Sequence, residues 1–297
     1  MARHRAAILA LILAGCHPSQ PVPVPAATGF GMIGPGIIST MMPEFALTLS
    51  ADGNEMYFNR ASADRSELSI MVSRRVAGQW TAPEVAPFSN AGRNVDPFIE
   101  PGGERLYFSS TRPRDGSSKA TFSTWYVERT PSGWGEPVDP GAPLNSDSSD
   151  IFVSVSRSGD LYFSSARGGP MAIYTSSSRD GRWSVPLRVD LGSVATGAGN
   201  PMISPDGKVL LVTMRRPGSD ADIMYSCRTA SGWSEPRALP APVNSTRADF
   251  APSIDMSGRM LYFTSERPGL MGAQPDSVRP PGDLYGIPLK DAGISCP

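Results

Sequence analysis

The side chains that usually carry acid–base or nucleophilic chemistry are scarce in this sequence. Of 297 residues only two are His, His4 and His17, and both lie close to the N-terminus. Serine–histidine–aspartate triads, cysteine–histidine dyads and histidine-containing zinc sites all need a His in the folded region. Such sites are therefore excluded, and the chemistry left to the body of the chain is that of Asp, Glu and Arg.

Acidic and amide side chains recur at one place in each of five repeated segments. We expect this place to be the start of an innermost strand, so that these side chains converge on one mouth of a central channel. Carboxylates gathered there could bind Ca²⁺, a basic peptide segment or sugar hydroxyls. The alternative, which we favour, is that they cap the connections between repeats by accepting hydrogen bonds from backbone N–H groups. The candidates are Glu44, Asn94, Asp150 and Asp249, with Asp96 and Asn200 two residues further on and Ala198 in the fourth repeat.

Arg and Cys form two further sets. An Arg follows four of the repeated phrases, and a ring of Arg could clamp anionic groups bidentately. We favour the interpretation in which each Arg pairs with an acid of its own repeat, such as Asp222 or Asp283. Cys227 and Cys296 could form a disulfide in an oxidising compartment or remain separate thiols, and their spacing does not decide between the two. The arginines are Arg112, Arg167, Arg216 and Arg267.

All these residues belong to a sequence that repeats about every fifty residues. One phrase, a turn with Gly followed by an apolar or aromatic run, occurs five times, and a Gly-Trp phrase recurs four times in the same register. This period suits a four-stranded propeller blade with the Gly at a hairpin turn and the aromatic run as an inner strand. The Pro after the Trp belongs in a rim strand, where a missing N–H costs no ladder bond. The phrases are 50–58, 100–108, 156–163, 204–212 and 255–263, and the Gly-Trp phrases contain Trp80, Trp134, Trp183 and Trp233.

Composition agrees with an all-β chain. The 30 Gly and 30 Pro argue against long helices, because an interior Pro removes a hydrogen-bond donor and clashes with the preceding turn. The net charge of -1 gives no basic excess of the kind that binds nucleic acid, which we exclude as a partner.

The repeated phrase resembles the PD40 repeat, the WD40-like propeller unit of TolB-type periplasmic proteins. Ser204-Pro205-Asp206-Gly207 matches the family phrase intact, whereas repeat one has Asn59-Arg60 where Ser-Ser is usual. The resemblance covers residues 40–289 and implies a single all-β propeller over 30–297. TolB-type propellers have six blades, but five repeats favour five four-stranded blades over six. Because repeat five lacks the Gly-Trp phrase, we expect residues 30–40 to supply its rim strand and close the ring.

The N-terminus carries an export signal. A basic start precedes the apolar run 6–14, which is too short to cross a membrane as a mature helix. The overlapping Leu13-Ala14-Gly15-Cys16 resembles the lipobox of bacterial lipoproteins, which implies cleavage after residue 15 and acylation of Cys16. The alternative is an ordinary secretory signal with an incidental Cys.

We therefore predict three regions: a lipoprotein signal peptide over 1–15, a lipidated Cys16 with a Pro-rich tether over 16–29, and the propeller over 30–297. The lipid would anchor the protein to a membrane without a spanning helix. In lipoproteins an Asp after the Cys usually signals retention at the inner membrane. His17 in that place favours an outer-membrane lipoprotein, either periplasmic or surface-exposed.

Two functions are compatible with these features. The first is an envelope-anchored, non-enzymatic propeller that binds a protein or a cell-wall polysaccharide, as the TolB-like resemblance implies. The second is a glycosidase-like hydrolase with carboxylates at the channel mouth. A catalytic pair needs unequal environments, whereas the best candidates here occupy equivalent positions, so we favour binding over catalysis. We expect no cofactor, with Ca²⁺ at the mouth as the alternative.

Overall fold

The computed structural model describes residues 29–114, 121–179, 182–192, 197–215, 220–275 and 278–297. The predicted signal peptide, Cys16, all but the last residue of the predicted tether, and Arg216 lie outside the described residues. Within those residues, no helix is long and apolar enough to cross a membrane.

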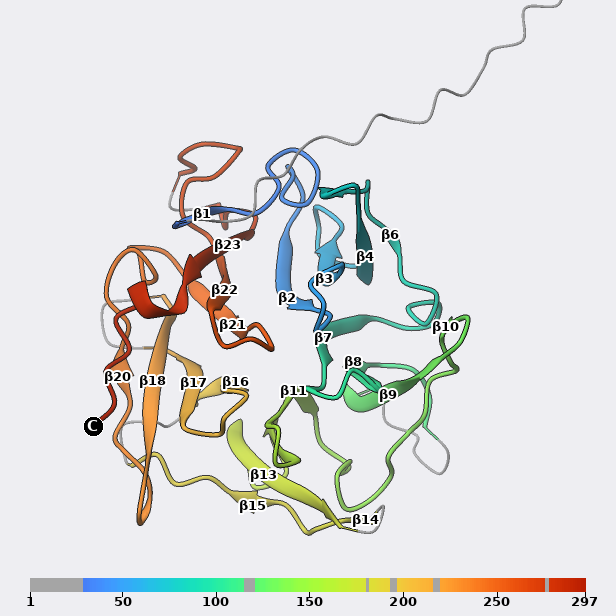
Figure 1. Cartoon of the computed structure of the whole chain (residues 1–297), viewed down its shortest axis with the longest axis vertical. Coiled ribbons are helices and arrows are strands. Elements are labelled where there is room, and N and C mark those ends of the chain that lie inside the picture. Colours follow the sequence, from blue (N-terminus) through green and yellow to red (C-terminus); the bar gives the residue numbers. More distant parts are fainter. Residues whose placement is uncertain (1–28, 115–120, 180–181, 193–196, 216–219, 276–277) are drawn as a thin grey trace, which may run out of the picture.

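Five antiparallel sheets stand around a central axis, and the innermost strands β2, β7, β11, β16 and β21 surround that axis (Figure 1). The prediction of an all-β propeller with five four-stranded blades is confirmed. In three blades the rim consists of two short strands that pair with the same third strand.

The strands of each blade follow one another from the axis outwards. Blade one contains β2 (Glu44–Leu49), β3 (Glu55–Ala61), β4 (Leu68–Val76), β5 (Gln79–Trp80) and β6 (Glu84–Val85). Blade two contains β7 (Asn94–Ile99), β8 (Arg105–Ser110), β9 (Ser123–Thr130) and β10 (Gly133–Trp134). Blade three contains β11 (Asp150–Val155), β12 (Asp160–Ser165), β13 (Ala172–Arg179), β14 (Arg182–Trp183) and β15 (Leu187–Arg188). Blade four contains β16 (Gly199–Ile203), β17 (Val209–Met214), β18 (Asp222–Thr229), β19 (Gly232–Trp233) and β20 (Arg237–Ala238). Blade five contains β21 (Asp249–Ile254), β22 (Met260–Ser265), β23 (Asp283–Pro288) and, from the N-terminal side, β1 (Gly31–Met32).

The repeated phrase forms the hairpin between the first two strands of each blade. Gly53 and Gly207 turn the chain with φ of 70° and 72°, a left-handed conformation that Gly adopts without steric cost. The aromatic run then enters the second strand, where its rings are buried between neighbouring blades. Seven of the largest fully buried side chains belong to it: Tyr57, Phe58, Tyr107, Phe108, Tyr162, Phe163 and Phe263.

Pro residues interrupt the rim strands, as their missing N–H predicts. Pro186 lies between β14 and β15, and Pro236 lies between β19 and β20. The Trp before the Pro also joins blades, because Trp134 Nε1 of blade two donates a hydrogen bond of 2.7 Å to Tyr57 Oη of blade one. The rim strands therefore pair with the third strand of their blade, and Pro keeps them short.

The two ends of the chain close the ring at blade five. β1 pairs with β23 as the rim strand, as expected from the missing phrase of repeat five. Ile33 N continues the pairing with a hydrogen bond of 2.7 Å to the carbonyl of Leu284. Beyond β23 and the short 3₁₀ helix η2 (Leu289–Asp291), a disulfide joins Cys296 to Cys227 of β18 in blade four. Residues 31–33 are thus held by blade five, and Cys296 is held by blade four.

Candidate functional site

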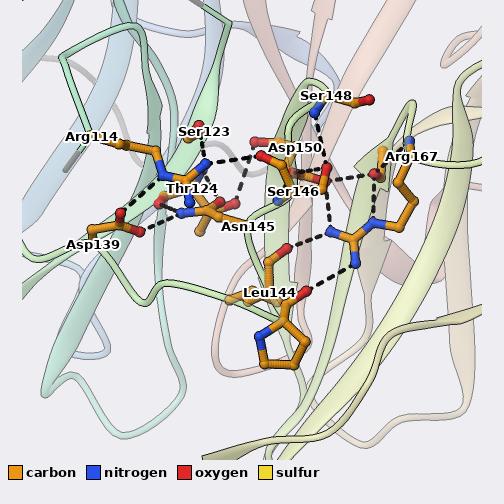
Figure 2. A network of polar contacts seen from close by, with 12 residues as sticks. Arg114, Ser123, Thr124, Asp139, Leu144, Asn145, Ser146, Ser148, Asp150 and Arg167 are labelled. Carbon is orange, nitrogen blue, oxygen red and sulfur yellow. Dashed lines mark hydrogen bonds and ion pairs between the residues drawn. The ribbon is translucent and has the colours of Figure 1, made fainter. Parts of the chain in front are cut away.

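Asp150, at the start of blade three, shows how the strand-start acids are held (Figure 2). Its side chain is fully buried. Oδ2 accepts hydrogen bonds from the backbone N–H and the hydroxyl of Ser146 at 2.6 and 2.7 Å. Oδ1 accepts hydrogen bonds from the hydroxyl of Ser165 at 2.5 Å and from Arg167 Nη2 at 2.7 Å. Arg167 also donates to the carbonyl of Leu144, so the network fixes the connection that arrives from blade two.

The same arrangement recurs at the start of three other blades. In each, a fully buried side chain accepts a hydrogen bond from an Arg that also donates to carbonyls of the incoming connection. The pairs are Glu44 with Arg60 at 2.8 Å, Asn94 with Arg112 at 3.2 Å, and Asp249 with Arg267 at 2.9 Å.

These contacts are those of structural caps, the interpretation favoured from the sequence. Because an Arg neutralises each acid, the described residues do not gather the concentrated negative charge expected at the mouth. Arg267 pairs with Asp249 and not with Asp283, which corrects the partner suggested from the sequence. Burial raises the pKa of Glu44 despite its Thr40 and Arg60 partners. Burial and the nearby Glu44 raise the pKa of Asp283 to about 6.

A second polar cluster supports the connection into blade three (Figure 2). Asn145 donates hydrogen bonds to the carbonyl of Thr124 at 2.8 Å and to Asp139 Oδ1 at 2.7 Å, and its own Oδ1 accepts one from Thr124 N at 2.9 Å. Arg114 pairs with Asp139 at 2.9 Å and donates to the carbonyl of Ser146. The Asn-Ser phrases at Asn145-Ser146 and Asn244-Ser245 are therefore turn-forming elements before the starts of blades three and five.

Two residues after each strand-start position (44, 94, 150, 198 and 249), the backbone leaves the regular hydrogen-bond ladder of the sheet. Every innermost strand has a register shift here, and one residue lies in the left-handed region with φ between 49° and 58°. A non-Gly residue in this conformation is uncommon and marks a bulge that the surrounding structure enforces. The five bulge residues are Ala46, Asp96, Phe152, Asn200 and Ala251.

Side chains of the preceding blade hold four of these bulges. Asp96 N donates a hydrogen bond to Asn59 Oδ1 at 2.7 Å, and Phe152 N donates one to Ser109 Oγ at 3.1 Å. The same contact joins Asn200 N to Ser164 and Ala46 N to Thr264. The first Ser of the Ser-Ser pair in the repeat thus links neighbouring blades. In blade four the equivalent is Thr213, whose buried Oγ1 has no hydrogen-bond partner among the described residues.

Asp96 differs from the other predicted acids because it lines the channel. All five innermost strands contribute to the channel wall, which leaves about 10 Å³, the space of roughly one water molecule. Ala46, Phe152 and Ala251 make the wall apolar. Burial there raises the pKa of Asp96 to about 7. Asn200 occupies the equivalent bulge position in blade four but does not line this cavity, so of the six predicted residues Asp96 alone lines the channel, while Glu44, Asn94, Asp150 and Asp249 are held in caps.

A groove of about 500 Å³ lies between blades four and five. We call it the 4/5 groove. Asn200, Thr213 and Phe250 line it together with five charged side chains: Arg215, Asp220, Arg247, Glu266 and Arg279.

One buried acid organises the basic side of the 4/5 groove. Glu266 is 5% exposed and receives hydrogen bonds or ion pairs from Arg279 at 2.6 Å and from Arg65 of blade one at 3.8 Å. Arg215, which is exposed, has no ion pair with any described residue. The sequence analysis missed these residues because they lie outside the repeated phrases and recur in no other blade. Only their clustering in space identifies them.

Metal ligands do not converge in the part of the chain that the structure describes, where no three His, Cys, Asp or Glu side chains are placed to hold an ion. A cation at the mouth would depend on Asp96, because Glu44, Asp150 and Asp249 already have Arg partners.

Comparisons with known proteins agree with the fold. No protein-family model matches the sequence, and no curated protein matches it. The chain is similar to a TolB-type protein from Agrobacterium tumefaciens, with 18% identity over 76% of this chain and 71% of that chain and a TM-score of 0.52. It is similar to a GH62 hydrolase solved with xylotriose, with 13% identity over 91% of this chain and 95% of that chain and a TM-score of 0.54.

TolB from Acinetobacter baumannii is also similar, with 15% identity, a TM-score of 0.49, and coverage of 85% of this chain and 55% of that chain. At such identities the likeness shows a TolB-like propeller fold and nothing finer. Because a TolB and a hydrolase share this architecture, function has to be argued from the site.

Proposed function

We propose that this protein is an exported, membrane-anchored propeller that binds a protein or a cell-wall polysaccharide without catalysing a reaction. The binding surface is the strand-start face, defined as the end of the propeller where the innermost strands begin, with Phe250 and Asn200 at its channel mouth. In this proposal the repeats are of the PD40 type, and the anchor is an acylated Cys16 at the outer membrane.

The burial of the strand-start acids carries the proposal. Glycoside hydrolysis needs two carboxyl groups about 5 to 9.5 Å apart that face the substrate. Asp150 and Asp249 are 0% exposed and paired with Arg, so they cannot take either role. Among the described residues that line the channel, Asp96 has the one carboxylate. An arrangement with one acid in the channel and a charged groove beside it supports binding better than hydrolysis.

The partner can be sought by crosslinking from the proposed face. A photoreactive phenylalanine analogue replaces Phe250 in one variant and Val185, which is 73% exposed on the rim of blade three, in a matched control. We expect irradiation of cells to crosslink an envelope component to the Phe250 variant and not to the Val185 variant. Equal crosslinking by both variants, or none by either, would reject the strand-start face as the binding surface.

The anchor is tested separately. Cys16→Ser removes the acylation site, and Cys16 precedes the first strand of the propeller, β1 (Gly31–Met32), so the variant is expected to fold and leave the membrane fraction. Recovery of folded Cys16→Ser protein in the outer-membrane fraction would show that another element anchors the protein.

Hydrolysis is the second candidate, and one observation favours it. A carboxyl group with a pKa near 7 at a channel is suited to general acid–base chemistry, and that is the condition of Asp96. A hydrolase would cleave aryl glycosides or xylo-oligosaccharides, and Asp96→Asn would abolish the cleavage. Turnover that Asp96→Asn removes would replace the binding proposal with this one.

A further inference from the structure

The 4/5 groove has the chemistry of a carbohydrate site with a basic side. We infer that it binds a short acidic saccharide, a sugar chain that carries carboxylates of the uronic acid type. This inference rests on the proposed function, because it names the ligand class for the same face of the propeller.

The groove lies where the repeat breaks down. Blade four begins with Ala198, so it lacks the acid that fastens blades one, three and five to an Arg. It also has Thr213 where other blades use their side chain to hold the next bulge, and this buried hydroxyl has no partner among the described residues. A buried hydroxyl without a partner costs free energy unless a ligand or water satisfies it. Thr213 lines the 4/5 groove and its Oγ1 is buried, so blade four has no described counterpart of the side-chain contact that links the other blades.

Charge in the groove favours a carboxylate over a more highly charged anion. Three Arg side chains and two acids line it, which gives a small positive excess. Arg279 is 60% exposed but is oriented by Glu266, so part of its guanidinium remains available to the groove. Guanidinium groups bind carboxylates with matched, bidentate geometry. The neighbouring Asp220 and Glu266 would repel a phosphate dianion, which carries both charges on one group, more strongly than a saccharide whose carboxylates lie one sugar ring apart.

The uncharged part of the groove is suited to a sugar ring. Phe250 offers an aromatic surface, and the Asn200 amide is a short polar group that can bond sugar hydroxyls. A volume of about 500 Å³ lies within the usual size range of small-molecule sites. A peptide C-terminus is generally captured by a nest of backbone N–H groups, whereas the donors here are side chains on two blades.

The test uses digalacturonate as the probe and cellobiose as the neutral disaccharide of similar size. Isothermal titration calorimetry of the full-length chain in detergent, at low salt, should detect digalacturonate and not cellobiose. Arg215→Gln should weaken digalacturonate binding by about tenfold, the order of one charge-assisted hydrogen bond. Arg237→Gln, on the exposed rim strand of the same blade, removes the same charge and should leave binding unchanged. Raising the salt concentration should weaken binding to the parent protein.

Several outcomes would overturn the inference. These are equal binding of cellobiose, unchanged binding by Arg215→Gln, an equal loss in Arg237→Gln, or tighter binding of a short peptide with a free C-terminal carboxylate. Arg279→Gln is a second variant, but it can disturb Glu266, so its affinity for digalacturonate is compared only if its melting temperature equals that of the parent. Arg215 is exposed, so Arg215→Gln tests the groove without affecting folding. If crosslinking at Phe250 captures a partner but digalacturonate does not bind, this inference fails and the proposed function stands. If crosslinking fails at Phe250 as well, the proposed function fails too.

Discussion

Blades three and four are neighbours built from the same repeat, yet their strand starts differ completely. In blade three Asp150 is enclosed by Ser146, Ser165 and Arg167, with each carboxylate oxygen accepting two hydrogen bonds. In blade four the same position is Ala198, and the next blade-linking hydroxyl, Thr213, has no described partner. The 4/5 groove lies beside the second arrangement.

This difference distinguishes the residues of the repeat that hold the blades together from the residues that are available to bind a ligand. Residues that recur in every blade have the same task in every blade, which is to join a blade to its neighbour. A ligand needs one site with unequal surroundings, so a departure from the repeat is a better guide to function than the repeat itself. Blade four compensates for the missing acid elsewhere, because Cys227 on its third strand is joined to Cys296 at the end of the chain.

The largest expected effect comes from breaking the blade-three network. Asp150→Ala leaves the guanidinium of Arg167 without its carboxylate in a position where that side chain is only 16% exposed. Removing one partner of a buried pair costs about 3–5 kcal/mol of unfolding free energy. Urea unfolding should report this loss. Asp160→Ala, which removes a less buried turn acid of the same blade, should cost less than about 1 kcal/mol; similar losses for both variants would refute the special role of Asp150.

Opening the disulfide tests how blade four is fastened. Cys296→Ser removes a crosslink between positions 69 residues apart, and such a loss typically costs about 2–4 kcal/mol. The cysteine to replace is Cys296, because its side chain is exposed and its loss leaves no buried cavity, unlike that of Cys227. A reducing agent should lower the melting temperature of the parent to that of Cys296→Ser and leave the melting temperature of Cys296→Ser unchanged. A parent protein that is insensitive to reductant would show that blade four does not depend on the crosslink.

Asp96 and Asn200 give a comparison across the channel, since both occupy bulge positions but only Asp96 ionises. Its folded-state pKa of about 7 lies above the ordinary value of 3.8, so the folded state holds a proton that the unfolded state has lost. Stability should therefore fall as pH rises from about 4 to about 7 and stay level above that range. Asp96→Asn should remove this slope and raise the unfolding free energy at pH 8. If the unfolding free energy of the parent did not change between pH 5 and pH 8, Asp96 would have to be solvated in the channel.

Much of the fold can be predicted from the repeat because each phrase contains its own physical cause. The Gly turn, the buried aromatic pair and the Pro-limited rim each occur once per period, so five periods give five blades, and the missing phrase of repeat five predicts the closing β1. The partners of the recurring Arg residues were predicted less well. Asp249 and Asp283 are almost equally distant from Arg267 in sequence, and it is the hairpin of β21 and β22 that brings Arg267 to Asp249 at the start of β21.

The candidate site could be predicted only in part. Asp96 and Asn200 were found because they stand at a fixed distance from a recurring motif. Arg215, Glu266 and Arg279 come from three separate connections and recur nowhere, so no periodic signal marks them, and their meeting at one groove depends on how blades four and five pack.

The smallest effect, and the sharpest comparison, concerns the hydroxyl that links one blade to the next. Ser109→Ala in blade two leaves the backbone N–H of Phe152 buried without its acceptor, which should cost about 1–3 kcal/mol. Thr213→Val in blade four keeps the shape of the side chain and removes a buried hydroxyl that has no described partner, so the variant should be at least as stable as the parent. If Thr213→Val were as costly as Ser109→Ala, Thr213 would hold Ala251 N as the other blades hold their bulges. Blade four would then be linked to blade five by the same contact that joins the other blades, and the contrast between blades three and four would be lost.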